Sequence, residues 1–212
     1  MAVARVKFPE INLIIAMTES GLIGSGGSLP WKSRIDLNWF KKWTVGWPVV
    51  FGRKTAASMP VFPLRNRPCA IVSNKGENNG PLVFSSIHHA IRHFQNFDKI
   101  FIAGGSSLYN SALRDVKLET NESMIDVVIK TEFPDGYVNG DTYLDKHSLS
   151  LISEEFFSLV DRAVVKYFSE HKMYLPDGKM PDLPGEGSLD VKDDETLFPW
   201  IKFEIWKRRK IK

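Results

Sequence analysis

Two segments of the sequence place glycine directly after a short apolar run, a pattern typical of a strand that passes into a helix. Residues 48–51 (PVVF) lead into residues 52–55 (GRKT), and residues 100–103 (IFIA) lead into residues 104–107 (GGSS). A helix that begins at such a point presents free backbone N–H groups and its positive dipole end, which attract an anion. We therefore expect a phosphate-bearing ligand there, although a helix cap beside surface cations explains residues 52–55 equally well.

These glycines do not belong to a common nucleotide-binding motif. Neither junction has the spacing G-x-G-x-x-G, and residues 24–27 (GSGG) lack the lysine of a P-loop. In an open parallel sheet, ligands bind outside the carboxyl ends of the strands. We expect the ligand to lie across that edge. The four glycines and two serines of residues 21–30 predict a mobile loop beside it.

Asp36 is the third feature with chemical potential. It is the only acidic residue between Gly21 and Phe51, and its neighbours along the chain are mostly aromatic or aliphatic. On a helix it shares a face with Phe40. A carboxylate buried there costs several kcal/mol unless it is paired. A ligand with two adjacent N–H donors, such as an aminopyrimidine, would satisfy it, while the alternative is a solvent-facing Asp36 bonded to Lys32 or Arg34.

The elements that must position these residues follow from hydrophobic spacing. Strands are predicted at residues 12–17, 48–51, 69–73, 99–103, 125–131 and 201–206, and helices at residues 32–44, 55–58, 107–113 and from Ser85 or Ser86 through Phe94. Strands that alternate with helices predict a three-layer α/β fold with a mainly parallel central sheet, and residues 201–206 alternate like an antiparallel C-terminal edge strand. We expect one domain over residues 1–212, with a loop-rich insertion at about 145–199.

Composition limits the class of protein. The chain is 43% hydrophobic and 25% charged, which argues against disorder, and its net charge of +3 is too small to predict nucleic-acid binding. The single cysteine, Cys69, allows no intrachain disulfide, and the apolar residues 11–17 are too short to span a bilayer. The histidines have no metal-ligand spacing. We expect a cytoplasmic protein that binds no metal, nucleic acid or membrane.

Taken in order along the chain, these features resemble the dihydrofolate reductase family. The matching features run from about residue 12 to residue 142: an apolar strand, a glycine-rich loop, Leu29-Pro30-Trp31, Asp36, Trp39-Phe40, residues 52–55, Arg67 and Gly104-Gly105. The resemblance implies NADPH-dependent reduction of 7,8-dihydrofolate to 5,6,7,8-tetrahydrofolate, within one-carbon and thymidylate metabolism. Hydride would pass to pterin C6 with protonation at N5. It also implies a monomer that binds antifolate inhibitors.

The resemblance assigns site residues position by position. Those with a catalytic role would be Asp36, Trp31, Leu29 and Thr131. Those that bind substrate would be Ile14, Ile15, Leu37, Phe40, Met59, Leu64, Arg67, Ala103 and Tyr109. Those that bind NADPH would be Ala16, Ile23, Gly24, Gly52, Arg53, Lys54, Thr55, Ser73, Asn74, Gly104, Gly105, Ser106, Ser107 and Leu108.

Several finer expectations come with the resemblance. Asp36, supported by the hydroxyl of Thr131, would hold N3 and the 2-amino group of the pterin, and Arg67 would pair with the glutamate carboxylate. Residues 21–31 would close over the nicotinamide, and residues 140–142 would contact this gate. A cis peptide is implied between Gly104 and Gly105. The chain departs from the family at Ala103, usually a bulky aliphatic residue, and at Ala56, commonly a large aromatic residue.

Three other functions share parts of this pattern. A pyrimidine reductase of riboflavin biosynthesis has the same architecture, but Asp36 and Arg67 favour folate. A paralogue could bind folate or NADPH without turnover, with the extended C-terminal region as its partner surface. The chain could also be one domain of a longer bifunctional enzyme, whose linker would start in the basic residues 207–212.

Overall fold

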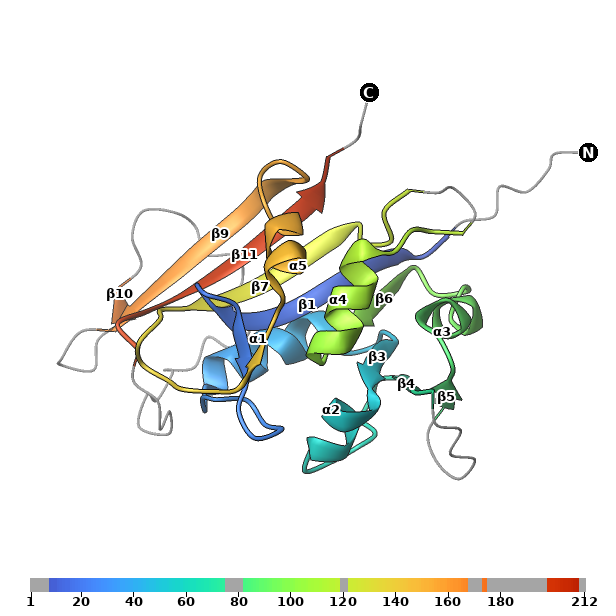
Figure 1. The fold of residues 1–212 in the computed structure, drawn as a ribbon, viewed down its shortest axis with the longest axis horizontal. Helices are drawn as coiled ribbons and strands as arrows, with labels where there is room; N and C mark the ends of the chain where they lie inside the picture. The colour runs from blue at the N-terminus through green and yellow to red at the C-terminus, as the bar shows by residue number, and fades with distance from the viewer. Residues whose placement is uncertain (1–7, 75–81, 119–121, 168–172, 175–197, 210–212) are drawn as a thin grey trace, which may run out of the picture.

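Apolar runs of the sequence form the strands of one central sheet in the computed structural model, which describes residues 8–74, 82–118, 122–167, 173–174 and 198–209. In these residues the sheet has the order β10-β9-β11-β7-β1-β6-β3-β4-β5 (Figure 1). Its strands are β1 Glu10–Thr18, β3 Val49–Gly52, β4 Cys69–Val72, β5 Leu82–Phe84, β6 Lys99–Ile102, β7 Val127–Phe133, β9 Phe157–Tyr167, β10 Met173–Tyr174 and β11 Trp200–Arg208.

The sheet is parallel from β5 to β7 and antiparallel beyond it. β1 pairs in parallel with β6 and β7, and β3 pairs in parallel with β4 and β6. β11 runs antiparallel to β7, as expected for the last strand. It does not end the sheet, however, because β9 and then β10 continue beyond it. The predicted α/β class is therefore confirmed, with a longer antiparallel edge than the sequence indicated.

Helices cover both faces of the sheet. They are α1 Arg34–Thr44, α2 Arg53–Ser58, α3 Ile87–His93, α4 Ser106–Arg114 and α5 Lys146–Leu151. Strand β1 is buried on both sides, since Leu13 and Ile15 belong to the core with α3 and α4, while Ile14 belongs to the core with α1 and α2. Such two-sided burial is what a parallel strand covered by helices requires. No helix in the described ranges is long and apolar enough to cross a membrane.

Helix starts agree with the capping residues in the sequence. The Ser33 hydroxyl accepts a hydrogen bond from the Asp36 N–H at 3.3 Å, so α1 begins after Ser33. Of the two candidate caps for α3, Ser86 is the one used, and it accepts from the His89 N–H. A serine at this position satisfies a backbone donor that the first turn leaves without a helical partner.

Two expectations about loops need correction. Part of the glycine-rich residues 21–30 is a strand, β2 Leu22–Gly24, because it pairs with β8 Thr142–Tyr143 in a separate two-stranded sheet. The predicted loop-rich residues 145–199 contain α5 and the eleven-residue β9 in their first part. β9 forms because β11 pairs along its length, a contact between distant parts of the chain. Residues 168–172 and 175–197 lie outside the described residues.

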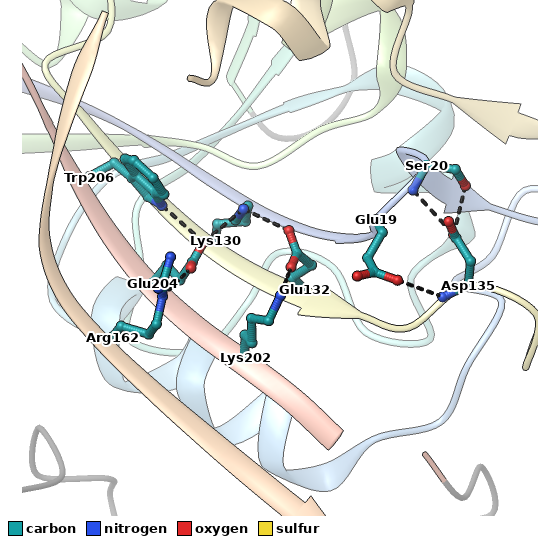
Figure 2. Close-up of polar contacts among 9 residues, drawn as sticks. All are labelled: Glu19, Ser20, Lys130, Glu132, Asp135, Arg162, Lys202, Glu204 and Trp206. Carbon is teal, nitrogen blue, oxygen red and sulfur yellow. Dashed lines mark hydrogen bonds and ion pairs between the residues drawn. The ribbon is translucent and has the colours of Figure 1, made fainter. Parts of the chain in front are cut away.

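Ion pairs link the three strands β7, β11 and β9 (Figure 2). The Lys130 ammonium contacts Glu132 at 2.8 Å and Glu204 at 2.7 Å. Glu204 also accepts from Arg162 at 2.6 Å, and Glu132 accepts from Lys202 at 2.6 Å. Lys130 and Glu204 are buried, so each charge needs these partners. The network ties the antiparallel edge to β7, the strand that carries Thr131.

Candidate active site

The two glycine junctions lie against each other at the carboxyl ends of β3 and β6. The Gly52 N–H donates to the Gly104 carbonyl at 2.6 Å, and the Ala103 N–H donates to the Val50 carbonyl at 3.0 Å. The peptide between Gly104 and Gly105 is cis, as expected. The sequence predicted each junction separately, and the parallel order β6-β3 joins them into one edge.

Bare backbone is a structural requirement at this edge. A Cβ atom on Gly105 would lie 2.8 Å from the Thr55 hydroxyl oxygen. Gly104 has a φ of +91°, and a Cβ atom there would lie 3.2 Å from the ring of Tyr109. Larger residues would therefore displace their neighbours, and the glycines leave the backbone open to a ligand that approaches this edge.

Asp36 is buried rather than solvent-facing. Its exposed fraction is 6%, so the alternative prediction, in which it extends into solvent, is wrong. It lies in the first turn of α1, near the positive end of the helix dipole, which favours a carboxylate. Burial gives this carboxylate the dry surroundings in which a bidentate contact to a ligand is strongest.

Tyr109 lies on α4, which covers the face of the sheet opposite to α1, and its ring lies next to Gly104. Its hydroxyl donates to the Ile14 carbonyl at 2.7 Å, which fastens α4 to β1. Burial raises the pKa of Tyr109 far above its ordinary value, and the negative charge of Asp36 raises it further. The charge of Asp36 therefore reaches Tyr109, although α1 and α4 cover different faces.

Trp31 and Thr131 complete the buried part of the site. Thr131 is buried on β7, where it pairs in register with Ala16 of β1. The Trp31 ring packs on Phe133 with centroids 4.3 Å apart. Its indole N–H is buried and has no hydrogen-bond partner in the described part of the chain. It is a donor available to a ligand group or a water molecule.

Arg67 is held by three contacts. Its Nη1 donates to the Thr44 hydroxyl at 3.0 Å, its Nε donates to the Arg65 carbonyl at 3.2 Å, and its guanidinium lies over the Phe40 ring at 5.8 Å. Burial lowers the pKa of Arg67. Thr44 is not among the residues predicted from the sequence. Its signal is a threonine on the last turn of α1, eight positions after Asp36.

The other predicted site residues differ in exposure. Leu29 and Leu37 are 47% and 57% exposed, so both lie on the rim. Other exposed members are Lys54, Asn74 and Ser107. Partly buried members are Ala16, Met59, Leu64, Arg53, Thr55, Ser73 and Ser106, and buried members are Ile14, Ile15, Ile23, Gly24, Ala103 and Leu108. Ile15, Ile23 and Leu108 belong to the core beneath α4, whereas Ile14 and Ala103 belong to the core beneath α1.

The expected contact between residues 140–142 and the glycine-rich segment is present. The Asp141 N–H donates to the Gly24 carbonyl at 3.1 Å, and the Asp141 carboxylate accepts from the Gly26 N–H at 3.0 Å. A second link lies where β1 ends, because the Ser20 hydroxyl donates to Asp135 at 2.7 Å (Figure 2). Two aspartates of the β7–β8 connection thus hold the segment that leads to Trp31.

Comparison with known proteins agrees with this geometry. The model of the family described as dihydrofolate reductase matches residues 10–164. The chain belongs to the dihydrofolate reductase family. The match extends from β1 into β9, so it contains Asp36, Arg67, Tyr109 and Thr131.

Individual dihydrofolate reductases align with the same region. The enzyme of Buchnera aphidicola is 35% identical over 135 residues, which are 63% of this chain and 76% of that protein. The enzyme of Mycobacterium leprae is 36% identical over 107 residues, 49% of this chain and 65% of that protein. A bifunctional dihydrofolate reductase-thymidylate synthase of Paramecium tetraurelia is 38% identical over 104 residues, 48% of this chain and 22% of that protein.

A solved dihydrofolate reductase has the same fold. The structure from Enterococcus faecalis, complexed with NADP(H) and RAB-propyl, superposes with a TM-score of 0.65. The superposition covers 95% of this chain and 97% of that one, at 22% sequence identity. It therefore supports the architecture, including the antiparallel edge that follows β7.

Proposed function

We propose that this chain reduces 7,8-dihydrofolate to 5,6,7,8-tetrahydrofolate with NADPH. The observation that carries the proposal is the buried carboxylate of Asp36 in the first turn of α1. It lies in a chain that belongs to the dihydrofolate reductase family. A buried carboxylate at the start of a helix can accept two parallel N–H bonds from a planar ligand. A pterin offers two such donors, N3 and its 2-amino group.

The described side chains fit the parts of dihydrofolate in order. Asp36 binds the pyrimidine edge, with Thr131 beside it, and the indole N–H of Trp31 donates to a water or to the pterin. Phe40, which carries the Arg67 guanidinium over its ring, packs against the benzoyl group. Arg67 then pairs with the α-carboxylate of the glutamate. The same Asp36 contact would hold diaminopyrimidine antifolates.

The glycine edge fits the cofactor. The backbone is closely packed at this edge, which is formed by Gly52, Gly104 and Gly105. A Cβ atom on Gly105 would meet Thr55. A diphosphate can approach such an edge closely, and the side chains of Arg53 and Lys54 add positive charge for the 2′-phosphate. When bound, NADPH supplies the hydride. The residues of the chain bind and orient both ligands and exclude water from between them.

Asp36 acts on the pterin through charge and orientation. A neutral dihydropterin accepts hydride poorly, and a proton on N5 supplies the missing positive charge. Asp36 lies at the pyrimidine edge, away from N5, so its negative charge stabilises the protonated ring while water delivers the proton. Residues 21–31 cover the reacting atoms, and Asp141 holds that segment in place through Gly24 and Gly26.

We also propose a single-domain, monomeric and cytoplasmic protein that does not bind nucleic acid. The adjacency of β11, near the end of the chain, to β7 supports one domain, with an insertion between β9 and β11. A net charge of +3 supports the absence of nucleic-acid binding. Size-exclusion chromatography with light scattering tests the oligomeric state.

The test of the reaction follows NADPH absorbance after addition of dihydrofolate, with Asp36→Asn beside the wild type. We expect turnover by the wild type and a loss of roughly 10²–10³-fold in the variant near neutral pH, the typical size of a lost electrostatic contact to a transition state. NADPH binding without turnover would favour a binding protein. Turnover of a ribityl-phosphate pyrimidine in place of dihydrofolate would favour the riboflavin-pathway reaction.

A further inference from the structure

The segment that holds the gate continues directly into a contact with α4. Residues 141–144 pair with residues 21–26: Asp141 binds Gly24 and Gly26, and the Leu144 N–H donates to the Gly21 carbonyl at 2.9 Å. The next residue is Asp145. It lies between β8 and α5, and both of its carboxylate oxygens are used.

Asp145 contacts both its own segment, where its carbonyl accepts from the Leu149 N–H at 2.9 Å, and helix α4. Its Oδ1 accepts from the Ser148 N–H at 2.8 Å, which caps α5. Its Oδ2 forms an ion pair with Arg114, and its backbone N–H donates to the Asn110 side-chain oxygen at 3.4 Å. Asn110 and Arg114 are one turn apart and share a face of α4. Asp145 therefore joins the gate-holding segment to one face of that helix.

α4 extends from this contact to the cofactor edge. It begins after Gly105, and its first turn carries Ser106 and Ser107, while Arg114 is its last residue. A helix of this length transmits a displacement of one end to the other, because its backbone hydrogen bonds make it stiff. The Tyr109 hydroxyl fixes its middle to the Ile14 carbonyl. Cofactor contacts at one end are thus mechanically connected to Asp145 at the other.

We propose that Asp145 is a positioning residue that couples the cofactor helix to the gate. It acts through Arg114 and Asn110 on one side and through the Asp141 segment on the other. Bound NADPH then favours the closed gate, and a closed gate slows the release of NADPH. This inference rests on the proposed function, since it takes α4 to be the helix that binds the cofactor.

A purely structural role for Asp145 would be the capping of α5. Asp145→Asn distinguishes the two roles, because asparagine caps a helix about as well as aspartate but removes the ion pair with Arg114. Arg114→Met removes the same pair from the other side and keeps an apolar stem. Glu10→Gln is the matched control. Glu10 pairs with Lys99 at 3.7 Å. The side chain of Glu10 is 33% exposed and that of Lys99 is 39% exposed, which is similar to 38% for Asp145 and 45% for Arg114.

The experiment measures the rate of NADPH dissociation from the full chain by competition with excess cofactor, together with the melting temperature. We expect Asp145→Asn and Arg114→Met each to raise the dissociation rate roughly three- to ten-fold, within the range of measured site-to-site couplings. The dissociation rate of the double variant should be close to that of either single variant, and the rate of Glu10→Gln should match that of the wild type. Unchanged dissociation rates, with or without a lower melting temperature, would overturn the proposal.

A double-mutant cycle between Arg114→Met and Asp141→Asn tests the coupling itself. These residues lie on different elements, and Asp141 contacts the gate while Arg114 does not. Non-additive effects on the dissociation rate support the proposal, whereas additive effects overturn it. The readout requires only NADPH binding. A wild type that binds NADPH but does not reduce dihydrofolate would contradict the proposed function and leave this measurement interpretable.

Discussion

The Thr44 hydroxyl joins α1 to the guanidinium of Arg67. It donates to the Phe40 carbonyl at 2.8 Å and accepts from Arg67 Nη1 at 3.0 Å. Thr44 is fully buried, and the Arg65 carbonyl takes the Arg67 Nε donor. The guanidinium is thus fixed on two of its N–H groups before a substrate arrives, and its remaining donors are left for a carboxylate.

Thr44→Val should weaken the binding of dihydrofolate through its glutamate carboxylate. Valine has the same shape, but it cannot accept from Arg67, so the guanidinium loses its fixed orientation. We expect KM for dihydrofolate to rise about ten-fold, the equivalent of one hydrogen bond to a charged group, with little change in kcat. Steady-state kinetics with dihydrofolate and with a reduced pterin that lacks the glutamate measure the effect. An equal rise in KM for both substrates would refute this role, and Thr44→Ser should behave like the wild type.

Gly140→Ala should displace the gate. A Cβ atom at Gly140 would overlap the Gly24 carbonyl oxygen and would lie 2.6 Å from Leu22, so β2 must move away from β8. We expect hydride transfer in a single turnover to slow roughly ten-fold or more, as small misplacements in an active site often cause. The exposed neighbour Asn139, changed to alanine, is the control. A normal hydride-transfer rate in Gly140→Ala would show that the position of β2 does not limit the reaction.

Glu204→Gln should reveal how the contribution of the buried ion pairs to the free energy of unfolding depends on pH. Burial acts to raise the pKa of Glu204, but the hydrogen bond and charge of Lys130, with hydrogen bonds from Arg162 and Trp206, outweigh it, and the pKa lies below its ordinary value of 4.5. A lowered pKa means that Glu204 stabilises the folded state above pH 4.5 and loses this effect as the pH falls further. Breaking the buried network should cost about 3 kcal/mol near neutral pH.

Thermal unfolding of the wild type and of Glu204→Gln, from neutral pH to about pH 3, measures the difference in the free energy of unfolding. The difference should be largest near neutral pH and should shrink below pH 4.5. A difference that stays constant over the whole range would mean that the charge of Glu204 is not the stabilising feature. The more exposed Glu10, changed to glutamine, serves as the control for a surface ion pair.

Tyr109→Phe removes the hydroxyl of Tyr109 and keeps its ring, so it measures the contribution of the hydroxyl to stability. The hydroxyl is buried and donates to the Ile14 carbonyl, so its loss should lower the free energy of unfolding by about 1 kcal/mol. Tyr143 is half exposed, and Tyr143→Phe should change stability by less than about 0.5 kcal/mol. Urea unfolding compares the two variants. Equal stability of Tyr109→Phe and the wild type would show that the contact to Ile14 contributes nothing.

Local patterns in the sequence determined most of the parallel half of the fold. Strands β1, β3, β4 and β6 are short apolar runs bounded by turn residues, because a strand buried on both faces needs apolar side chains throughout. Ser86, one of the two serines expected to cap α3, begins that helix, since a cap acts on its own first turn. The order of Asp36, Arg67 and Gly104-Gly105 along the chain was sufficient to indicate the family.

Only the tertiary structure decided which of these residues meet. Strand β9 has no clear local pattern, and it forms because β11, more than thirty residues later, pairs with it. β2 is a strand for the same reason, through β8. The burial of Asp36 and the contacts of Thr44 with Arg67 and of Asp145 with Arg114 all depend on distant segments of the chain. Sequence spacing describes neighbours along one element, whereas these contacts depend on how the helices on both faces of the sheet pack against segments far away in the sequence.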